Sequence, residues 1–82
     1  MATVTLYSRR TCGLCDEARA EIEALRSEIP FELDEVLIDG RDDLERAYGI
    51  RVPVVLVDGA EAFEIHVDRE ELRALVARSS GA

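Results

Sequence analysis

The chain contains no lysine, no tryptophan and no long apolar run. Its longest uninterrupted apolar stretch, 52–57, has six residues, whereas a helix that crosses a bilayer needs roughly 20. The first seven residues also lack the basic region and apolar stretch of a secretory signal. There is no internal repeat and no linker rich in glycine, proline or serine. These absences predict a cytoplasmic protein.

Positive charge is scarce as well. Ten basic residues stand against eighteen acidic ones, which leaves a formal net charge of −8. Nucleic acids and anionic membranes bind clustered positive surface, so neither is expected as a partner. The length of 82 residues suffices for a single domain, 1–82, and an apolar content of 48% favours a folded core over a disordered segment.

Hydrophobic periodicity predicts alternating strands and helices in the first half of the chain. The β-branched stretch 3–8 is typical of a strand, and the apolar residues that follow recur at helical spacing. We expect this helix to end at Pro30, because the residue before a proline is forced out of the helical region. A second strand is predicted over 31–38, then a short helix over 42–48 with Gly49 as its C-terminal cap.

The second half predicts a hairpin followed by a helix. Residues 54–57 are a continuous apolar strand, and Asp58-Gly59 predicts a tight turn into a returning strand over 61–65. Asp68 is followed three residues later by a glutamate, the pattern of a helix N-terminus. We therefore expect a last helix over 68–78 and a frayed tail behind it.

The order of these elements predicts an α/β fold, βαβαββα. A strand, a helix and a second strand form a parallel pair with a right-handed crossover, whereas the closing hairpin is antiparallel. The expected architecture is a small mixed sheet of four strands with three helices on both faces.

Two cysteines stand where the first strand gives way to the first helix. Residues at i and i+3 are neighbours on a helix, so Cys12 and Cys15 can form and break a disulfide without unfolding, and Gly13 keeps the turn between them flexible. The unpaired amides and partial positive charge of a helix N-terminus favour the Cys12 thiolate. Arg9 and Arg10 add cationic charge nearby. We expect Cys12 to attack and Cys15 to resolve.

Other interpretations of the cysteine pair stay open. A zinc site needs four ligands, and the sole histidine, His66, lies about fifty residues away and would require a carboxylate in addition. An iron–sulfur cluster could be shared between two chains, with Cys12 from each. A static disulfide is rare in the cytoplasm. The position of the C-x-x-C motif between a strand and a helix favours a redox couple.

A second motif, Val52-Pro53, stands directly before the third strand. Together with the strand–C-x-x-C–helix start, it resembles the thioredoxin superfamily, and the small size is similar to the glutaredoxin branch over roughly 3–78. The resemblance implies a cis Val52–Pro53 bond packed against the cysteines. It also implies that the Val52 backbone pairs with an extended disulfide substrate as one more strand. The residues expected to contact substrate are Arg9, Arg10, Gly13, Leu14, Val52, Pro53 and Asp68.

The sequence departs from the glutaredoxin pattern where glutathione is usually held. Gly13-Leu14 replaces the common Pro-Tyr, so an aromatic of the glutathione groove is missing. No Gly-Gly pair precedes Asp68, and Glu64 stands in that stretch, where it would repel a carboxylate. The chain most resembles divergent bacterial glutaredoxin-like proteins.

The expected function is that of a glutaredoxin-like thiol–disulfide oxidoreductase, which reduces protein disulfides or protein–thiol mixed disulfides in electron transfer and cell redox homeostasis. The alternative is a non-enzymatic module that binds an iron–sulfur cluster or a small thiol. We expect a monomer without a tightly bound cofactor, reduced by glutathione, another small thiol or a reductase. The use of arginine for all ten basic residues is typical of a GC-rich bacterial genome, where the small thiol need not be glutathione.

Overall fold

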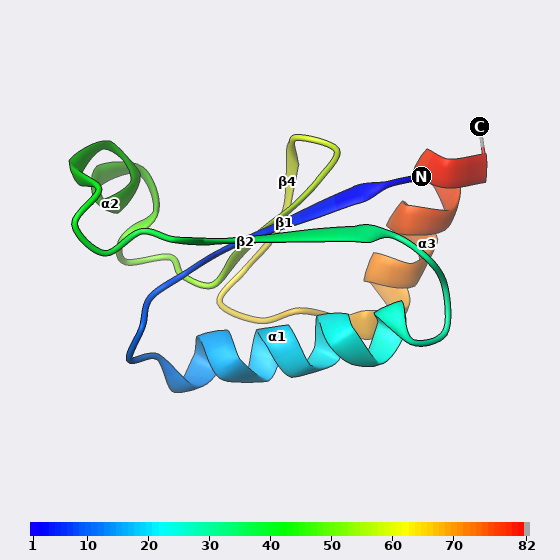
Figure 1. The fold of residues 1–82 in the computed structure, drawn as a ribbon, viewed down its shortest axis with the longest axis horizontal. Coiled ribbons are helices and arrows are strands. Elements are labelled where there is room, and N and C mark those ends of the chain that lie inside the picture. Colours follow the sequence, from blue (N-terminus) through cyan, green and yellow to red (C-terminus); the bar gives the residue numbers. More distant parts are fainter. Residues whose placement is uncertain (82) are drawn as a thin grey trace.

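The computed structural model describes the backbone of residues 1–81 and the side chains of residues 1–79 (Figure 1). Within that range it contains four strands and three helices: β1 (Thr3–Ser8), α1 (Gly13–Arg26), β2 (Glu32–Leu37), α2 (Asp42–Tyr48), β3 (Val54–Val57), β4 (Ala60–Glu64) and α3 (Arg69–Gly81). The strands form one sheet in the order β2-β1-β3-β4. The β1–β2 pair is parallel and the other two pairs are antiparallel. The predicted mixed sheet with three helices is confirmed.

The core lies between the sheet, α1 and α3. Alternate residues of β1 are buried, so that Val4 and Leu6 face this core. They join Ile22 of α1 and Leu72 of α3 in one apolar cluster. Removing each such side chain from water contributes about 1.5–3 kcal/mol, which makes this face the main source of stability.

On the second face of the sheet, an aromatic stack covers the corner next to α2. Tyr7 lies on the side of β1 opposite to Leu6, and its ring stacks on that of Tyr48 with 4.4 Å between centroids. No residue of α2 is buried, and Figure 1 shows α2 at the end of the sheet opposite to α3. Leu37 of β2 is consequently 41% exposed.

The first helix ends earlier than predicted. α1 stops at Arg26, four residues before Pro30. The hydroxyl of Ser27 donates to the Ala24 carbonyl at 2.7 Å, and a turn at residues 27–28 follows the helix. Because a serine side chain competes for helical carbonyls, the helix ends there, and Pro30 lies in the connection to β2.

The hairpin turn follows its sequence signal. Asp58 and Gly59 both have positive φ, 50° and 86°, as predicted. The turn also fastens the start of β1, because the Thr3 amide donates to Asp58 Oδ1 at 2.9 Å. The returning strand is Ala60–Glu64, one residue earlier than expected. It ends where Ile65 takes a φ of 71°, a left-handed conformation unusual for a β-branched residue.

The last helix begins where the sequence indicates and ends later. Asp68 Oδ1 accepts hydrogen bonds from the amides two and three residues on, at 3.0 and 3.2 Å, which confirms the predicted cap. The helix continues to Gly81. The predicted frayed tail is therefore wrong for residues 79–81, where no proline or glycine precedes Gly81 to end the helix. Ala82 lies outside the described residues.

Candidate functional site

Cys12 caps the N-terminus of α1. Its backbone is extended, with φ −153° and ψ 107°, and the Cys15 amide donates to Cys12 Sγ at 3.1 Å. The sulfur thus stands where a serine or threonine oxygen usually caps a helix. An amide donor and the partial positive charge of the helix end both favour negative charge at this atom. This local geometry would favour a thiolate at Cys12 once the disulfide is reduced.

The two sulfurs form a disulfide and differ in exposure. The Cα atoms of Cys12 and Cys15 are 5.2 Å apart across the bond. Cys15 has no exposed surface, whereas Cys12 is half-buried. Cys12 is therefore the sulfur that a partner can reach.

The Val52–Pro53 bond is cis, as the resemblance implied. In the register of β1 and β3, Tyr7 pairs with Val54, so the preceding Pro53 lies at the end of the sheet from which β1 leads into the cysteine loop. Pro53 is buried. The backbone amide and carbonyl of Val52 make no hydrogen bond within residues 1–81, which leaves them available to a partner chain.

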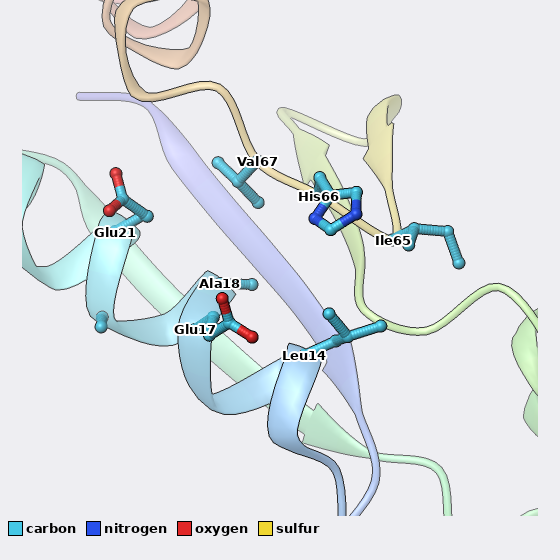
Figure 2. Close-up of a pocket in the computed structure, with 8 residues that line it drawn as sticks. Leu14, Glu17, Ala18, Glu21, Ile65, His66 and Val67 are labelled. Atoms are coloured by element: carbon cyan, nitrogen blue, oxygen red, sulfur yellow. The ribbon is translucent and has the colours of Figure 1, made fainter.

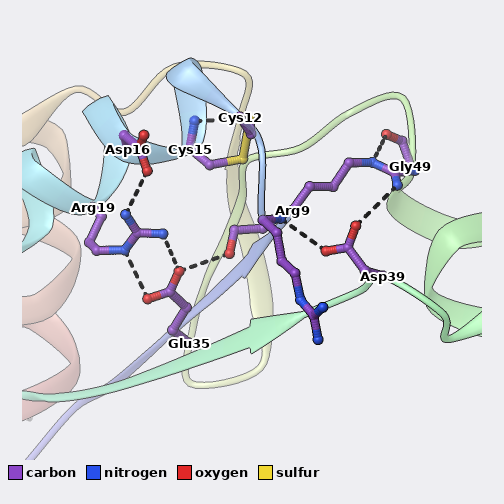
Figure 3. The surroundings of a disulfide bond; sticks show 10 residues. Arg9, Cys12, Cys15, Asp16, Arg19, Glu35, Asp39 and Gly49 are labelled. Carbon is purple, nitrogen blue, oxygen red and sulfur yellow. Dashed lines mark hydrogen bonds and ion pairs between the residues drawn. A yellow bond between two sulfur atoms is a disulfide. The ribbon is translucent and has the colours of Figure 1, made fainter.

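Arg9 points to α2 rather than to the sulfurs (Figure 3). Its guanidinium donates to Glu45 Oε1 at 3.1 Å and to the Gly49 carbonyl at 3.3 Å. Gly49 is the C-terminal cap of α2, as predicted, with a right-handed φ of −51°. A Cβ there would overlap the Glu45 carbonyl oxygen and lie 2.9 Å from Arg9 Nη2, so the close approach of the Glu45 backbone favours glycine. Arg9 joins the cysteine loop to α2.

The remaining predicted contact residues divide into two groups. Gly13 and Leu14 are exposed beside the cysteines. Arg10 is exposed too, with its amide donating to Asp39 Oδ2 at 2.9 Å, and its side chain forms no hydrogen bond or ion pair within the described range. Asp68, by contrast, uses its carboxylate to cap α3.

A groove opens at the start of α1, where it is lined by Leu14, the residue before Cys15 (Figure 2). Its volume is about 330 Å³, and one wall is α1 while the other is the loop between β4 and α3. The lining residues are Leu14, Glu17, Ala18, Ala20, Glu21, Ile65, His66 and Val67. The sequence motifs indicated Leu14 alone as a contact residue of this set.

The carboxylates of this groove are not the ones expected from the sequence. Glu64 pairs with Arg51, Oε2 to Nη1 at 3.2 Å, and does not line the groove. Glu17 and Glu21 do, although their helical spacing is equally typical of a solvated face. A hydrogen bond from Arg69 lowers the pKa of Glu21. The sequence signal that could have identified Glu17 and Glu21 is their position on the first helix, one and two turns after Leu14.

A second polar network fastens α1 to β2 below the cysteines (Figure 3). Arg19 donates through Nε to Glu35 Oε1 at 2.9 Å and through Nη1 to Asp16 at 2.8 Å. The hydroxyl of Ser8, which is fully buried, donates to Glu35 Oε2 at 2.8 Å. The Arg19 bond and then the Ser8 bond lower the pKa of Glu35. The first turns of α1 are thereby held in place.

Neither a metal cluster nor a membrane helix is found in the part of the chain that the structure describes. No group of three or more His, Cys, Asp or Glu side chains there is arranged to hold a metal ion. No described helix is both long and apolar enough to cross a bilayer.

Comparison with known proteins places these features in a family. A family model described as "Glutaredoxin-like domain (DUF836)" matches residues 3–77. An uncharacterized protein of Mycobacterium tuberculosis is 35% identical, over 94% of this chain and 84% of its own length. An X-ray structure from X. campestris is 36% identical, with a TM-score of 0.75, and covers 96% of this chain and 97% of that one. Thioredoxin from Fasciola hepatica is 26% identical, with a TM-score of 0.61 over 94% of this chain and 79% of its own.

Proposed function

The chain belongs to the family of glutaredoxin-like domains, and on that premise we propose that it is a thiol–disulfide oxidoreductase that reduces protein disulfides or protein–thiol mixed disulfides. The observation that carries the proposal is the position of Cys12, half-buried at the N-terminus of α1 and disulfide-bonded to the buried Cys15. A structural disulfide does not require its more exposed sulfur at a helix cap, whereas a nucleophilic thiolate benefits from it.

The proposed reaction is an exchange in two steps. The Cys12 thiolate attacks one sulfur of the partner disulfide, forms a mixed disulfide, and releases the other partner sulfur as a thiolate that takes up a proton. Cys15 then loses its proton and attacks Cys12 Sγ. The Cys12–Cys15 disulfide forms, the mixed disulfide breaks, and the partner leaves as a dithiol. Two electrons pass from this chain to the partner.

The free backbone of Val52 supports binding of an extended partner segment. An unpaired amide and carbonyl at a sheet end form the hydrogen bonds by which an added strand is recognised. Register with β1 puts this backbone at the same end of the sheet as the cysteine loop. Backbone pairing would suit protein substrates of varied sequence, because main-chain bonds do not depend on side-chain identity.

A small thiol or a reductase is proposed as the electron donor. Either would attack the Cys12–Cys15 disulfide at the exposed sulfur and restore the dithiol through a second exchange. Glutathione carries two carboxylates and would meet Glu17 in the adjacent groove. We therefore expect the chain to accept other thiols at least as well as glutathione.

Two cysteine variants test the proposal. In Cys12→Ser, turnover of a disulfide-bonded protein in the presence of a reductant should fall by about a hundredfold or more, because the nucleophile is removed. Cys15→Ser should accumulate a mixed disulfide that mass spectrometry detects on Cys12. Retained turnover in Cys12→Ser would contradict the proposal. Visible absorbance after anaerobic purification would instead favour the iron–sulfur alternative.

A further inference from the structure

The groove lies next to both parts of the candidate site. At one end it is lined by Leu14, which lies between the two cysteines in sequence. On the other wall it is lined by Ile65, whose amide donates to the Pro53 carbonyl at 2.8 Å. A partner segment bound at Cys12 and along the Val52 backbone would therefore lie close to this groove.

The charge of the groove is negative and only partly compensated. Its lining includes two carboxylates and no arginine. Arg69 neutralises Glu21 through two bonds, Nε to Oε2 at 2.8 Å and Nη2 to Oε1 at 3.0 Å. The Glu17 side chain forms no hydrogen bond or ion pair within residues 1–81. Figure 2 shows its carboxylate reaching from α1 toward the loop that carries His66.

Apart from the two carboxylates and His66, the side chains that line the groove are apolar, which fits a particular kind of partner side chain. Leu14 is 37% exposed, and Ile65 and Val67 are half-buried along the same walls. An arginine or lysine has an alkyl stem that packs on apolar surface and a cationic end that needs an anion. A volume of about 330 Å³ accommodates one such side chain. An acidic side chain would meet Glu17 in a groove whose lining contains no arginine.

We propose that this groove receives an arginine or lysine side chain that lies close to the disulfide cysteine of the partner protein, with Glu17 as the residue that selects for it. The inference rests on the proposed function and adds the class of substrate: disulfide proteins with basic residues next to the reactive cysteine. Glu17 determines specificity and takes no part in the exchange itself.

Matched peptides test the selection. Three short disulfide-bonded peptides would carry arginine, glutamine or glutamate at the second residue on each side of the cysteine. We expect kcat/KM for the arginine peptide to exceed that for the glutamine peptide about two- to five-fold, the range for one exposed ion pair. The glutamate peptide should fall below both. In Glu17→Gln the arginine-to-glutamine ratio should drop to about one.

Glu32→Gln is the control, because Glu32 is an exposed carboxylate on β2 outside the groove. It removes the same unit of charge, so an unchanged ratio in this variant excludes a general effect of net charge. Equal turnover of all three peptides by the unmodified protein would overturn the inference and leave the proposed function intact.

A binding measurement separates the two proposals. Peptides with serine in place of cysteine cannot react, and their affinity is measured by fluorescence anisotropy. Preference for the arginine peptide that disappears in Glu17→Gln supports the inference even if no disulfide is ever reduced. Affinity without regard to peptide charge contradicts it even if reduction is fast.

Discussion

At the scale of single residues, the helix cap distinguishes the two cysteines. Cys12 Sγ accepts the Cys15 amide at the end of α1, whereas Cys15 itself is enclosed by the core. One structural position thus gives one sulfur both access and stabilisation of negative charge. Arg9 beside it has a different partner, because its guanidinium donates to Glu45 and to the Gly49 carbonyl.

Alkylation of the reduced protein checks this distinction. We expect iodoacetamide to label Cys12 with a pH midpoint below the ~8.5 of a free cysteine, because the thiolate is stabilised by the helix N-terminus. Cys15 should be labelled much more slowly, since it has no exposed surface. Mass spectrometry of digests taken at several pH values measures both rates. A Cys12 midpoint at or above that of a free thiol would contradict the argument.

Arg9→Gln tests whether that arginine acts on the sulfur or on α2. We expect a loss of about 1 kcal/mol in the free energy of unfolding, since an ion pair and a carbonyl bond are removed. The alkylation rate of Cys12 should stay unchanged, because the guanidinium faces away from it (Figure 3). Urea denaturation and alkylation measure the two effects. Slower alkylation with unchanged stability would instead support the role expected from the sequence, in which Arg9 favours the Cys12 thiolate.

At the scale of elements, α2 is the least firmly attached. It buries no residue, and its contact with the sheet depends on the stack of Tyr48 on Tyr7. Arg51 lies 5.3 Å from the Tyr48 ring centroid and donates to the Ala47 carbonyl. Because Val52 and Pro53 follow directly, the same contacts hold the segment proposed to bind the partner.

Substitutions at Tyr48 separate the ring from its hydroxyl. Tyr48→Phe keeps the stack and should change stability by less than about 0.5 kcal/mol. Tyr48→Ala removes an aromatic pair and should cost about 1–2 kcal/mol, with faster amide exchange in α2. Hydrogen exchange compared between the two variants measures this. Equal protection of α2 in both would show that the stack does not hold the helix.

At the scale of the whole molecule, ion pairs connect elements that are distant in sequence. Glu35 forms an ion pair with Arg19, and Glu21 forms one with Arg69. Hydrogen bonds from these arginines lower the pKa of each glutamate, so the unfolded state binds more protons than the folded state in acid. Their contribution to stability is complete above the unfolded pKa and is lost as the pH falls through the folded values.

Acid titration of stability measures this contribution. The free energy of unfolding should decrease from about pH 5 downward, the range below the ordinary pKa of a glutamate. Glu35→Gln should lower stability at pH 7 by about 1 kcal/mol and flatten the acid decrease. Urea unfolding from pH 7 to about pH 3 compares the two proteins. Parallel curves of unfolding free energy against pH for the two proteins would show that Glu35 does not contribute to the pH dependence.

The features that were predicted correctly depend on residues that are neighbours along the chain. The turn at Asp58-Gly59 and the cap at Asp68 depend on local backbone geometry, and both were found. The end of α1 at Arg26 was missed because Pro30 is a stronger signal than a serine that bonds its own helix. The groove was missed because Glu17 meets the loop before α3 only in the folded chain.

At Ile65, which has a left-handed backbone, we expect thermal stability and selectivity between peptides to favour different residues. A branched residue held there costs about 1–2 kcal/mol relative to an ordinary conformation, and glycine would relieve it. We expect Ile65→Gly to raise the melting temperature by several degrees, about 4–8 °C for each kcal/mol in a domain of this size. It should weaken discrimination between peptides, because one wall of the groove loses the apolar side chain of Ile65. A variant made more heat-resistant at this position would thus be less selective among substrates.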